Sequence, residues 1–487
     1  MDFLDDIKNK IARHANILKA RHLSIRGSGL VANSLLLSRL WHVLRVNPAP
    51  EPWLQEVKSI VRKYVLPFWP APAWTTTCLP RRYGGVGLID IQDQSLALHF
   101  IYIQRLCAPR RVSDFLSPWI IKYYQQLTGH ASLLPWFLFP SKFKSHLSKD
   151  PNMAHLSKLI ARLPPLPLSS AWSSRWYLDL PLQDILPQNT DLPQLSSRYL
   201  LSDIVRWHLR RRCFIFYHHR QPPALSKVVQ WLHDTRTDDA YATITLPNNI
   251  IIRLYRTHFM TPDIQPAAPP QSLMPSLSHW SLAITSSTTR PVLTLSLGQV
   301  RRSWHPNWQE MLNRPQPPQL IRPFSLCYPT FVWQQFWRLP LPSKSITAWW
   351  RILHDCVAYR VKLHRWQPSR YPSTECPICQ TAPETLYHMI VDCPRKRPFW
   401  LDALSTYQLL GKFPTQASIW HALVQLRFTN GTTVPIPDLI RLGCILAVLW
   451  RHHWRCVIDE DFWSSEAALN TLLSDPLYSS FIPSETI

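Results

Sequence analysis

The chain has 487 residues, and 53 Lys and Arg against 30 Asp and Glu give it a formal net charge of +23. Only 17% of the residues are charged, so the surplus reflects scarce acids and favours a polyanionic partner, nucleic acid before a membrane surface. The 23 Trp residues and the 46% hydrophobic content exclude a wholly disordered chain. Ten cysteines are too few for a disulfide-stapled secreted scaffold, which favours a reducing compartment.

Residues 1–130 are expected to form a compact helical region. In residues 7–20, apolar residues recur every three or four positions with basic residues between them, as in an amphipathic helix. Further helices are expected from Gly29 to just before Asn47, with Leu30, Leu37 and Leu44 in one possible stripe, and over residues 52–66 and 88–105. The two longest apolar stretches, residues 30–44 and 439–450, are interrupted by arginines and are too short to span a membrane.

Residues 131–290 are expected to form a connector rich in Pro, Leu and Ser, with short helices and a possible strand pair. Ser202 is a potential N-cap for a helix that runs into Arg210, and residues 241–256 are the best strand candidate. The Pro/Ser/Thr-rich residues 265–291 favour a linker. After it, Ser296 and Gln299 have the spacing of a capping box. The fold class predicted for the whole chain is mainly α, with minor β.

One group of residues has the spacing of a metal site. Cys376, Cys379, His388 and Cys393 form C-x2-C-x8-H-x4-C, and zinc takes four such ligands in a tetrahedron. A helix over residues 384–391 would present His388 from its side and Cys393 just beyond its end. Four good ligands without a spare carboxylate predict one structural Zn²⁺ rather than a catalytic one.

Two alternatives to this zinc site stay open. The four residues could be buried thiols and a core histidine that cluster by chance. Three nearby residues, His354, Cys356 and His364, could also act as ligands, although Cys356 lies in an apolar helical stretch where a buried thiol is the ordinary case.

Three basic groups are candidates for nucleic-acid contacts, because cations bind phosphate and neighbouring rings stack on bases. Phe399 and Trp400 follow the first group. For each group, a solvated basic corner or helix end is the competing interpretation, with the aromatic residues packed inward. The groups are Arg395, Lys396 and Arg397; Arg81 and Arg82; and Arg210, Arg211 and Arg212.

Three segments resemble reverse transcriptases of non-LTR (LINE-type) retrotransposons. Residues 21–46, RHLSIRGSGLVANSLLLSRLWHVLRV, resemble the segment just past the palm, and residues 80–91, PRRYGGVGLIDI, resemble the P-x-x-x-GG-x-G block that follows it. Residues 331–366, running into CPICQTAPETLYHMIVDCP, resemble the zinc-binding domain of the same proteins. Ser28, where the family has a basic or small residue, is a minor departure.

The resemblance implies three regions: thumb-like helices (residues 1–130), a connector (131–290) and a zinc-binding domain with a helical tail (291–487). It implies binding of element RNA or target DNA and an intracellular, nuclear location. The short apolar stretches predict no membrane partner.

The polymerase active site of the family is not recognisable. The pairs Asp5-Asp6 and Asp238-Asp239 lack the surrounding palm motifs that would hold two Mg²⁺ ions. A nuclease needs a lysine near its carboxylates, and none follows Lys412.

The leading hypothesis is therefore a non-enzymatic, nucleic-acid-binding and zinc-binding C-terminal portion of such a reverse transcriptase. A stranded fragment of a decayed polymerase and a zinc-stapled protein-interaction module are the alternatives. Residues 439–463 are expected to form an amphipathic helix that packs against the zinc-binding domain.

Overall fold

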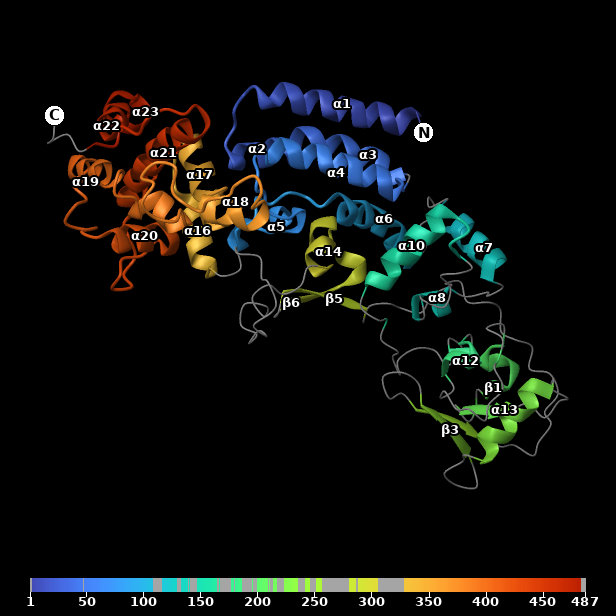
Figure 1. Ribbon diagram of the computed structural model, residues 1–487. Coiled ribbons are helices and arrows are strands. Elements are labelled where there is room, and N and C mark those ends of the chain that lie inside the picture. Colours follow the sequence, from blue (N-terminus) through green and yellow to red (C-terminus); the bar gives the residue numbers. More distant parts are fainter. Residues whose placement is uncertain are drawn as a thin grey trace. The chain divides into compact units, whose positions relative to one another are not determined.

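The computed structural model is mainly helical, as predicted (Figure 1). It describes residues 2–46, 48–107, 116–128, 133–138, 140, 147–163, 166, 177–178, 180–185, 195, 199–208, 210, 213–216, 223–234, 241–245, 251–255, 280–285, 288–304 and 328–482. The chain forms two compact units: Met1–His42, Ala49–Ile91 and Trp308–Ile487 make the first, and Val43–Pro48 with Gln92–Asn307 make the second. The three regions expected along the sequence divide the chain differently and stay a prediction.

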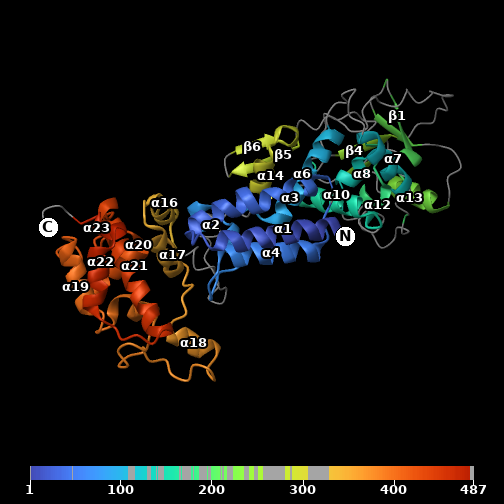
Figure 2. The ribbon, with the colours of Figure 1, turned by 90° about the horizontal axis from the view of Figure 1, so that it is seen from above.

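The N-terminal part of the first unit is built on helices that lie side by side (Figures 1 and 2). α1 packs on α4, where Trp53 Nε1 donates a hydrogen bond to the Leu4 carbonyl at 3.1 Å. The bounds of α4 agree with the predicted range to within one residue, whereas α1 begins at Asp2, earlier than the predicted residue 7. The elements from the N-terminus to residue 83 are α1 (Asp2–Lys19), α2 (Ile25–Val31), the π-helix η1 (Ala32–Leu37), α3 (Ser38–Val46), α4 (Glu51–Val65), α5 (Trp74–Cys78) and the 3₁₀ turn η2 (Arg81–Tyr83). The next helix, α6 (Ile91–Cys107), belongs to the second unit from Gln92 on.

The second predicted helix begins earlier than expected, at Ile25, and its buried face differs from the expected stripe. Leu37 and Leu44 of the expected stripe are completely buried, as predicted, but Leu30 is 54% exposed. The reason is the π-helical η1 in its middle, because a π turn inserts one residue and shifts the phase of the buried face.

The C-terminal part of the first unit is a helical cluster around two helices, α17 and α21. The indole of Trp349 on α17 donates to the Leu423 carbonyl at 2.6 Å, and α17 packs directly on α21. The predicted tail helix is confirmed as α21, which ends earlier than expected. The elements are α16 (Thr330–Arg338), α17 (Ser343–Leu353), α18 (Arg360–Trp366), the π-helix η7 (His388–Asp392), α19 (Arg397–Thr406), α20 (Gln416–Gln425), α21 (Ile436–Ile458), α22 (Ser465–Ser474) and α23 (Pro476–Ser479).

The glycine-rich block at residues 80–91 joins these two parts of the first unit. The Gly84 carbonyl accepts hydrogen bonds from Trp350 Nε1 at 2.9 Å and from His354 Nε2 at 2.8 Å. Gly84 and Gly87 have φ of 87° and 78°, which favours glycine at both positions. The block therefore fixes a tight turn against α17, 266 residues away in sequence.

The second unit combines short helices with two small sheets. One sheet has the strand order β1-β2-β4-β3, in which β2 and β4 are parallel and the other pairs antiparallel, and β5 with β6 forms a hairpin. The elements are α7 (Leu116–Thr128), α8 (Leu134–Leu138), α10 (Pro151–Arg162), α12 (Leu182–Ile185), the 3₁₀ turn η3 (Leu201–Asp203), β1 (Val205–His208), β2 (Cys213–Phe216), α13 (Pro223–Asp234), β3 (Tyr241–Thr245), β4 (Ile251–Tyr255), β5 (Ser281–Thr285), β6 (Thr288–Pro291), the 3₁₀ turn η5 (Val292–Thr294) and α14 (Leu297–Trp304).

Two expectations for this unit are confirmed and two are wrong. Residues 241–256 contain the antiparallel strands β3 and β4, and Ser296 with Gln299 forms the capping box of α14. The helix expected after Ser202 is instead η3 followed by β1, because Val205–His208 pairs with Cys213–Phe216. The end of the expected linker is the β5–β6 hairpin, and residues 265–279 lie outside the described residues.

A search of the described residues finds no helix long and apolar enough to cross a membrane.

Candidate metal centre

The four residues of the predicted quartet converge in the structure. One ligand atom from each of Cys376, Cys379, His388 and Cys393 lies within 4.8 Å of the others, and all four residues are buried. Cys379 Sγ is 3.4 Å from His388 Nε2. Zinc–sulfur and zinc–nitrogen bonds of about 2.3 and 2.0 Å place tetrahedral ligands about 3.5 to 3.8 Å apart. The quartet is therefore compact enough to hold a zinc ion.

The first two ligands lie in a short loop held by backbone pairing. Cys376 N donates to the Ala382 carbonyl at 2.9 Å, and Glu384 N donates to Thr374 at 2.8 Å, so the two ends of the loop run antiparallel. Within the loop, Gln380 N donates to the Cys376 carbonyl at 2.9 Å with φ of 57° at Gln380. This turn brings the thiols of Cys376 and Cys379 to the same side.

The second two ligands come from a short helix, as predicted, which ends in a π turn. His388 begins η7, and its backbone N–H donates to Thr385 Oγ1 at 3.1 Å. Cys393 follows directly after η7, and its N–H donates to the His388 carbonyl at 3.0 Å. A hydrogen bond between residues five apart widens the turn, which lets Cys393 reach the same point as His388.

Two of the thiols are hydrogen-bonded to each other, and a carboxylate lies beside the histidine. A hydrogen bond between Cys376 and Cys393 raises the pKa of Cys376 and lowers the pKa of Cys393. A divalent metal binds thiolates and displaces their protons. On the other side of His388, Nδ1 lies 3.7 Å from the Asp392 carboxylate, the kind of partner that orients a histidine ligand.

A buried charged cluster lies beside the quartet and joins it to α21. Lys396 is completely buried, and its ammonium donates to the Met389 carbonyl at 2.5 Å and to His453 Nδ1 at 3.0 Å. His453 Nε2 lies 3.9 Å from Glu384, whose other oxygen accepts from Arg360 N at 3.0 Å. Burial lowers the pKa of Lys396 and His453 and raises the pKa of Glu384.

This cluster shows that the tail helix packs against the zinc-binding region, as predicted. Sequence reasoning missed its members, Lys396, Glu384 and His453. The sequence gives little sign of this cluster, because the three residues have no characteristic spacing and meet only when α21 packs on the loop. His452 does not join them, since its Nε2 contacts Thr471 Oγ1 at 3.0 Å.

The first basic group is split by this packing. Arg395 and Arg397 are exposed, whereas Lys396 is buried and cannot reach a phosphate group at the surface in this arrangement. Phe399 and Trp400 are 0% and 2% exposed, so they pack inward as the competing interpretation stated.

The other basic residues occupy separate places. Arg82 is exposed with its guanidinium 4.8 Å from the Tyr83 ring, and Arg81 packs over Trp337 at 5.5 Å. Arg210 is an exposed residue of the second unit. Arg211 and Arg212 lie outside the described residues.

The alternative ligands do not join the quartet. His354 donates to Gly84, Cys356 Sγ lies 3.4 Å from the His354 carbonyl, and His364 Nδ1 lies 2.7 Å from the Tyr371 carbonyl. Within the described residues, the quartet is the one group of three or more such side chains placed to hold a metal.

The carboxylates considered for catalysis have other partners. Asp5 and Asp6 pair with Lys8 and Lys10 on the surface of α1, at 2.9 and 2.6 Å. Asp438, at the start of α21, is buried and pairs with Lys412 at 2.6 Å. Asp238 and Asp239 are not among the described residues.

Comparison with known proteins agrees with this geometry. Residues 320–400, which include the quartet, match a protein family described as zinc-binding in reverse transcriptase. The chain is also 22% identical over 426 residues to the Transposon TX1 uncharacterized 149 kDa protein of Xenopus laevis. That alignment covers 78% of this chain and 30% of the Xenopus protein, so the chain spans less than a third of its relative. The resemblance found in the sequence is confirmed: residues 320–400 are a reverse transcriptase zinc-binding region, in a chain distantly homologous to a non-LTR transposon protein.

Proposed function

We propose that this chain is a nucleic-acid-binding, zinc-binding part of a retrotransposon reverse transcriptase and does not itself catalyse polymerisation. The observation that carries the proposal is the buried quartet inside the region that matches the reverse transcriptase family. Its donors are three thiols and one imidazole, the set that structural zinc sites use.

The role proposed for zinc is architectural. The ion would join the loop that carries Cys376 and Cys379 to the helix that carries His388, and its binding energy would become folding energy of this region. All four ligand side chains are buried, which suits a closed site without an open position for substrate. The cluster of Lys396, Glu384 and His453 then stabilises the site by joining it to α21.

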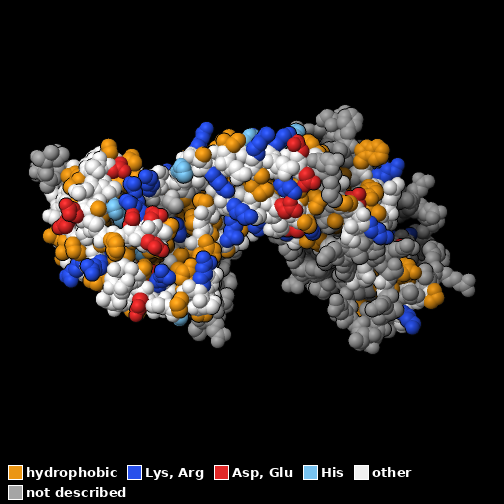
Figure 3. All heavy atoms as spheres, turned by 45° about the horizontal axis from the view of Figure 1, so that its top comes forward, with side chains coloured by type: hydrophobic (Ala, Val, Ile, Leu, Met, Phe, Trp, Pro, Cys, Tyr) orange, Lys and Arg blue, Asp and Glu red, His pale blue; other side chains and the backbone are white. Residues whose placement is uncertain are grey.

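The nucleic-acid part of the proposal rests on charge. The net charge of +23 attracts polyanions, and Figure 3 shows Lys and Arg side chains spread over the described part of one face among fewer Asp and Glu. Exposed Arg395 and Arg397 lie directly after the last zinc ligand. The absence of polymerase chemistry is supported by the pairing of Asp5 and Asp6 with lysines on a helix surface.

The test is a salt series of binding to single-stranded RNA and to duplex DNA, with the zinc content of the purified protein measured by atomic absorption. We expect one zinc per chain and an affinity that falls steeply with salt, since each phosphate contact contributes a slope of roughly 0.7 to 0.9 in log K against log salt. Binding that hardly responds to salt would indicate a protein-interaction module instead. A protein without zinc would contradict the metal assignment.

Catalysis is tested separately with a primed RNA template, deoxynucleotides and Mg²⁺. The chain should bind the primed template without extending it. Primer extension by the purified chain that a contaminating polymerase does not account for would overturn the non-catalytic assignment.

A further inference from the structure

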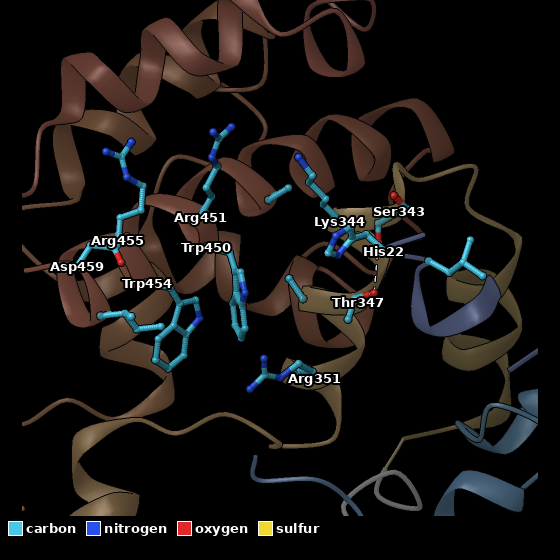
Figure 4. Close-up of a pocket in the computed structure, with 14 residues that line it drawn as sticks. His22, Ser343, Lys344, Thr347, Arg351, Trp450, Arg451, Trp454, Arg455 and Asp459 are labelled. Carbon is cyan, nitrogen blue, oxygen red and sulfur yellow. Dashed lines mark hydrogen bonds between the residues drawn. The ribbon is translucent and has the colours of Figure 1, made fainter. Parts of the chain in front are cut away.

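A basic and aromatic groove lies on the first unit, away from the zinc ligands. It is a cavity of about 540 Å³ between His22 and Leu23, helix α17 and helix α21 (Figure 4). Its walls are tied together, because Thr347 Oγ1 on α17 accepts a hydrogen bond from Ile25 N at 3.1 Å. We call this cavity the α17–α21 groove.

Cations outnumber acids at the rim of the groove, where Asp459 is the one carboxylate among the lining residues. Lys344 on α17 and Arg451 and Arg455 on α21 line it and are exposed (Figure 4). Arg451 and Arg455 are four residues apart, which places them on the same face of the helix. Arg455 pairs with Asp461 at 2.7 Å, whereas no ion pair among the described residues neutralises Lys344 or Arg451. The rim is therefore suited to anionic groups spaced along a chain.

The inner wall is aromatic. The rings of Trp450 and Trp454 lie 5.7 Å apart at 64°, and both side chains are partly exposed. Trp454 Nε1 is buried and has no hydrogen-bond partner among the described residues, so the groove is offered the ring of Trp454 and not its N–H group. Arg351 lies against the same wall, with its guanidinium 5.0 Å from the Trp450 ring and 4.3 Å from Phe68. Flat, partly exposed rings suit an unpaired base.

The same combination continues beyond the groove. Trp69, next to Phe68, is 54% exposed, and its ring lies 5.3 Å from that of Trp366, which is 47% exposed. Lys362 lies over Trp366 at 5.5 Å. This indole pair follows Phe68, which Arg351 contacts, and its cation Lys362 is also paired with Asp355 at 2.6 Å.

We propose that the α17–α21 groove binds a single-stranded nucleic-acid segment, with phosphates at Lys344 and Arg451 and a base against Trp450 and Trp454. This inference rests on the proposed nucleic-acid-binding function and identifies one surface that would contact the nucleic acid. A single strand is favoured over a duplex, because the rings in the groove can stack only on a base that is free of its partner. None of the basic groups noted in the sequence belongs to this groove.

The first test is charge reversal at the rim. The double variant Lys344→Glu/Arg451→Glu should bind a single-stranded RNA of mixed sequence at least tenfold more weakly than the wild type, with a smaller salt slope. The control is Lys63→Glu/Arg338→Glu, which makes the same charge change at exposed residues outside the groove. Equal losses in the two variants would mean that only net charge matters and would overturn the inference.

The second test addresses the aromatic wall. Trp454→Ala should weaken binding of single-stranded RNA about tenfold, since stacking on an aromatic residue contributes about 1 to 3 kcal/mol per base. Trp454→Phe should restore most of the affinity, and unchanged far-UV circular dichroism would exclude unfolding. If Trp454→Ala binds RNA as the wild type does, the base does not stack there and the inference fails.

Photo-crosslinking separates this inference from the function on which it rests. RNA that contains 4-thiouridine is bound to the full chain, irradiated and mapped by mass spectrometry. Crosslinks to peptides of α17 and α21 at the groove support the inference. Salt-sensitive RNA binding with crosslinks elsewhere overturns the inference and leaves the proposed function standing, whereas absence of RNA binding by the wild type overturns both.

Discussion

Cys379 connects the two halves of the metal centre, because its Sγ lies 3.4 Å from His388 Nε2 while its backbone belongs to the opposite loop. We predict that Cys379→Ser lowers the zinc content below one per chain and unfolds the loop locally, since a serine hydroxyl is a poor zinc ligand. Atomic absorption and tryptophan emission measure the two effects.

The matched control for this variant is Cys78→Ser. Cys78 is a partly exposed cysteine outside the quartet, so its replacement should leave the zinc content unchanged. A Cys379→Ser protein that keeps one zinc and wild-type emission would contradict the assigned ligand set.

His354 predicts an acid-sensitive contact between the glycine block and α17. Its ring is enclosed by Trp333 and Trp350 and donates to the Gly84 carbonyl, and burial lowers its pKa from 6.5 to about 3. Between these two values the unfolded chain binds a proton at His354 and the folded chain does not. The free energy of unfolding should therefore fall as the pH drops below 6.5, by about 1 kcal/mol per pH unit from this residue.

The measurement is urea unfolding of the wild type and of His354→Gln at pH 7.5, 6.5 and 5.5. The glutamine side chain can still donate a hydrogen bond but does not titrate, so the variant should lose less stability on acidification. Other buried histidines, such as His453, titrate in both proteins and cancel in the comparison. Equal pH slopes for the two proteins would show that His354 does not carry this dependence.

Lys396 marks the limit of residue-level prediction. The spacing of Cys376, Cys379, His388 and Cys393 was enough to predict the quartet, because the ligands come from one local loop and helix. The run of Arg395, Lys396 and Arg397 gave no sign that its middle member is buried. The Lys396 side chain points inward because it contacts His453, which in turn lies beside Glu384. These contacts form only when α21 packs on the loop.

Among the elements, the glycine block has the least tolerance for substitution. A Cβ on Gly85 would lie 1.9 Å from the backbone carbonyl oxygen of Leu79, which is fixed because it accepts from Gly87 N at 3.1 Å. We predict that Gly85→Ala lowers the free energy of unfolding by about 2 to 3 kcal/mol, as overpacking does. Thermal unfolding followed by circular dichroism measures this loss.

Gly411→Ala provides the comparison for this variant. A Cβ at Gly411 meets no atom within 4 Å, and its φ is not positive, so alanine should change the free energy of unfolding by less than about 1 kcal/mol. If the two variants are equally stable, the close approach at Gly85 is not a constraint on the fold.

The elements that sequence patterns predicted well are those with a long amphipathic period. Helices α1 and α4 and the tail helix α21 bury regular apolar stripes, and local periodicity is enough to find them. The segment around Val205 was assigned to a helix because a short apolar run fits either period. Residues Val205–His208 form a strand because they pair with Cys213–Phe216. This pairing is a tertiary contact, which a local stretch of sequence does not reveal.

The π turns η1 and η7 are also beyond a periodicity argument. η1 shifts the buried face of the second predicted helix by one residue, and η7 sets the distance from His388 to Cys393. Each insertion changes which side chains share a face without leaving a clear mark in composition.

At the scale of the whole molecule, the first unit brings together chain segments that lie more than 200 residues apart. Hydrogen bonds from Trp350 and His354 to Gly84 join the glycine block to α17, and the segment before α2 forms one wall of the α17–α21 groove. The glycine block and the zinc-binding region, which are far apart in the sequence, are thus packed together within the first unit. The groove was invisible in the sequence, since its residues come from three separate segments and carry no shared spacing.

Metal removal should affect this body unevenly. Without zinc, the loop and η7 are no longer held together by a shared metal ion. Lys396 donates to both Met389 and His453, so motion of η7 should also destabilise the C-terminal half of α21. We predict that chelation raises amide hydrogen exchange in residues 374–396 and in the turns of α21 near His453. Helices α1 and α4 should keep their protection, because they are held by their own contact through Trp53 and Leu4.

Hydrogen exchange mass spectrometry before and after chelation, with zinc added back as the control, measures this pattern. Recovery of protection on adding zinc would link the change to the metal rather than to the chelator. Uniform loss of protection across α1, α4 and α21 would mean that zinc stabilises the first unit as a single cooperative body. No change in residues 374–396 would mean that packing alone holds the loop, and the cluster of Lys396, Glu384 and His453 would then be its main support.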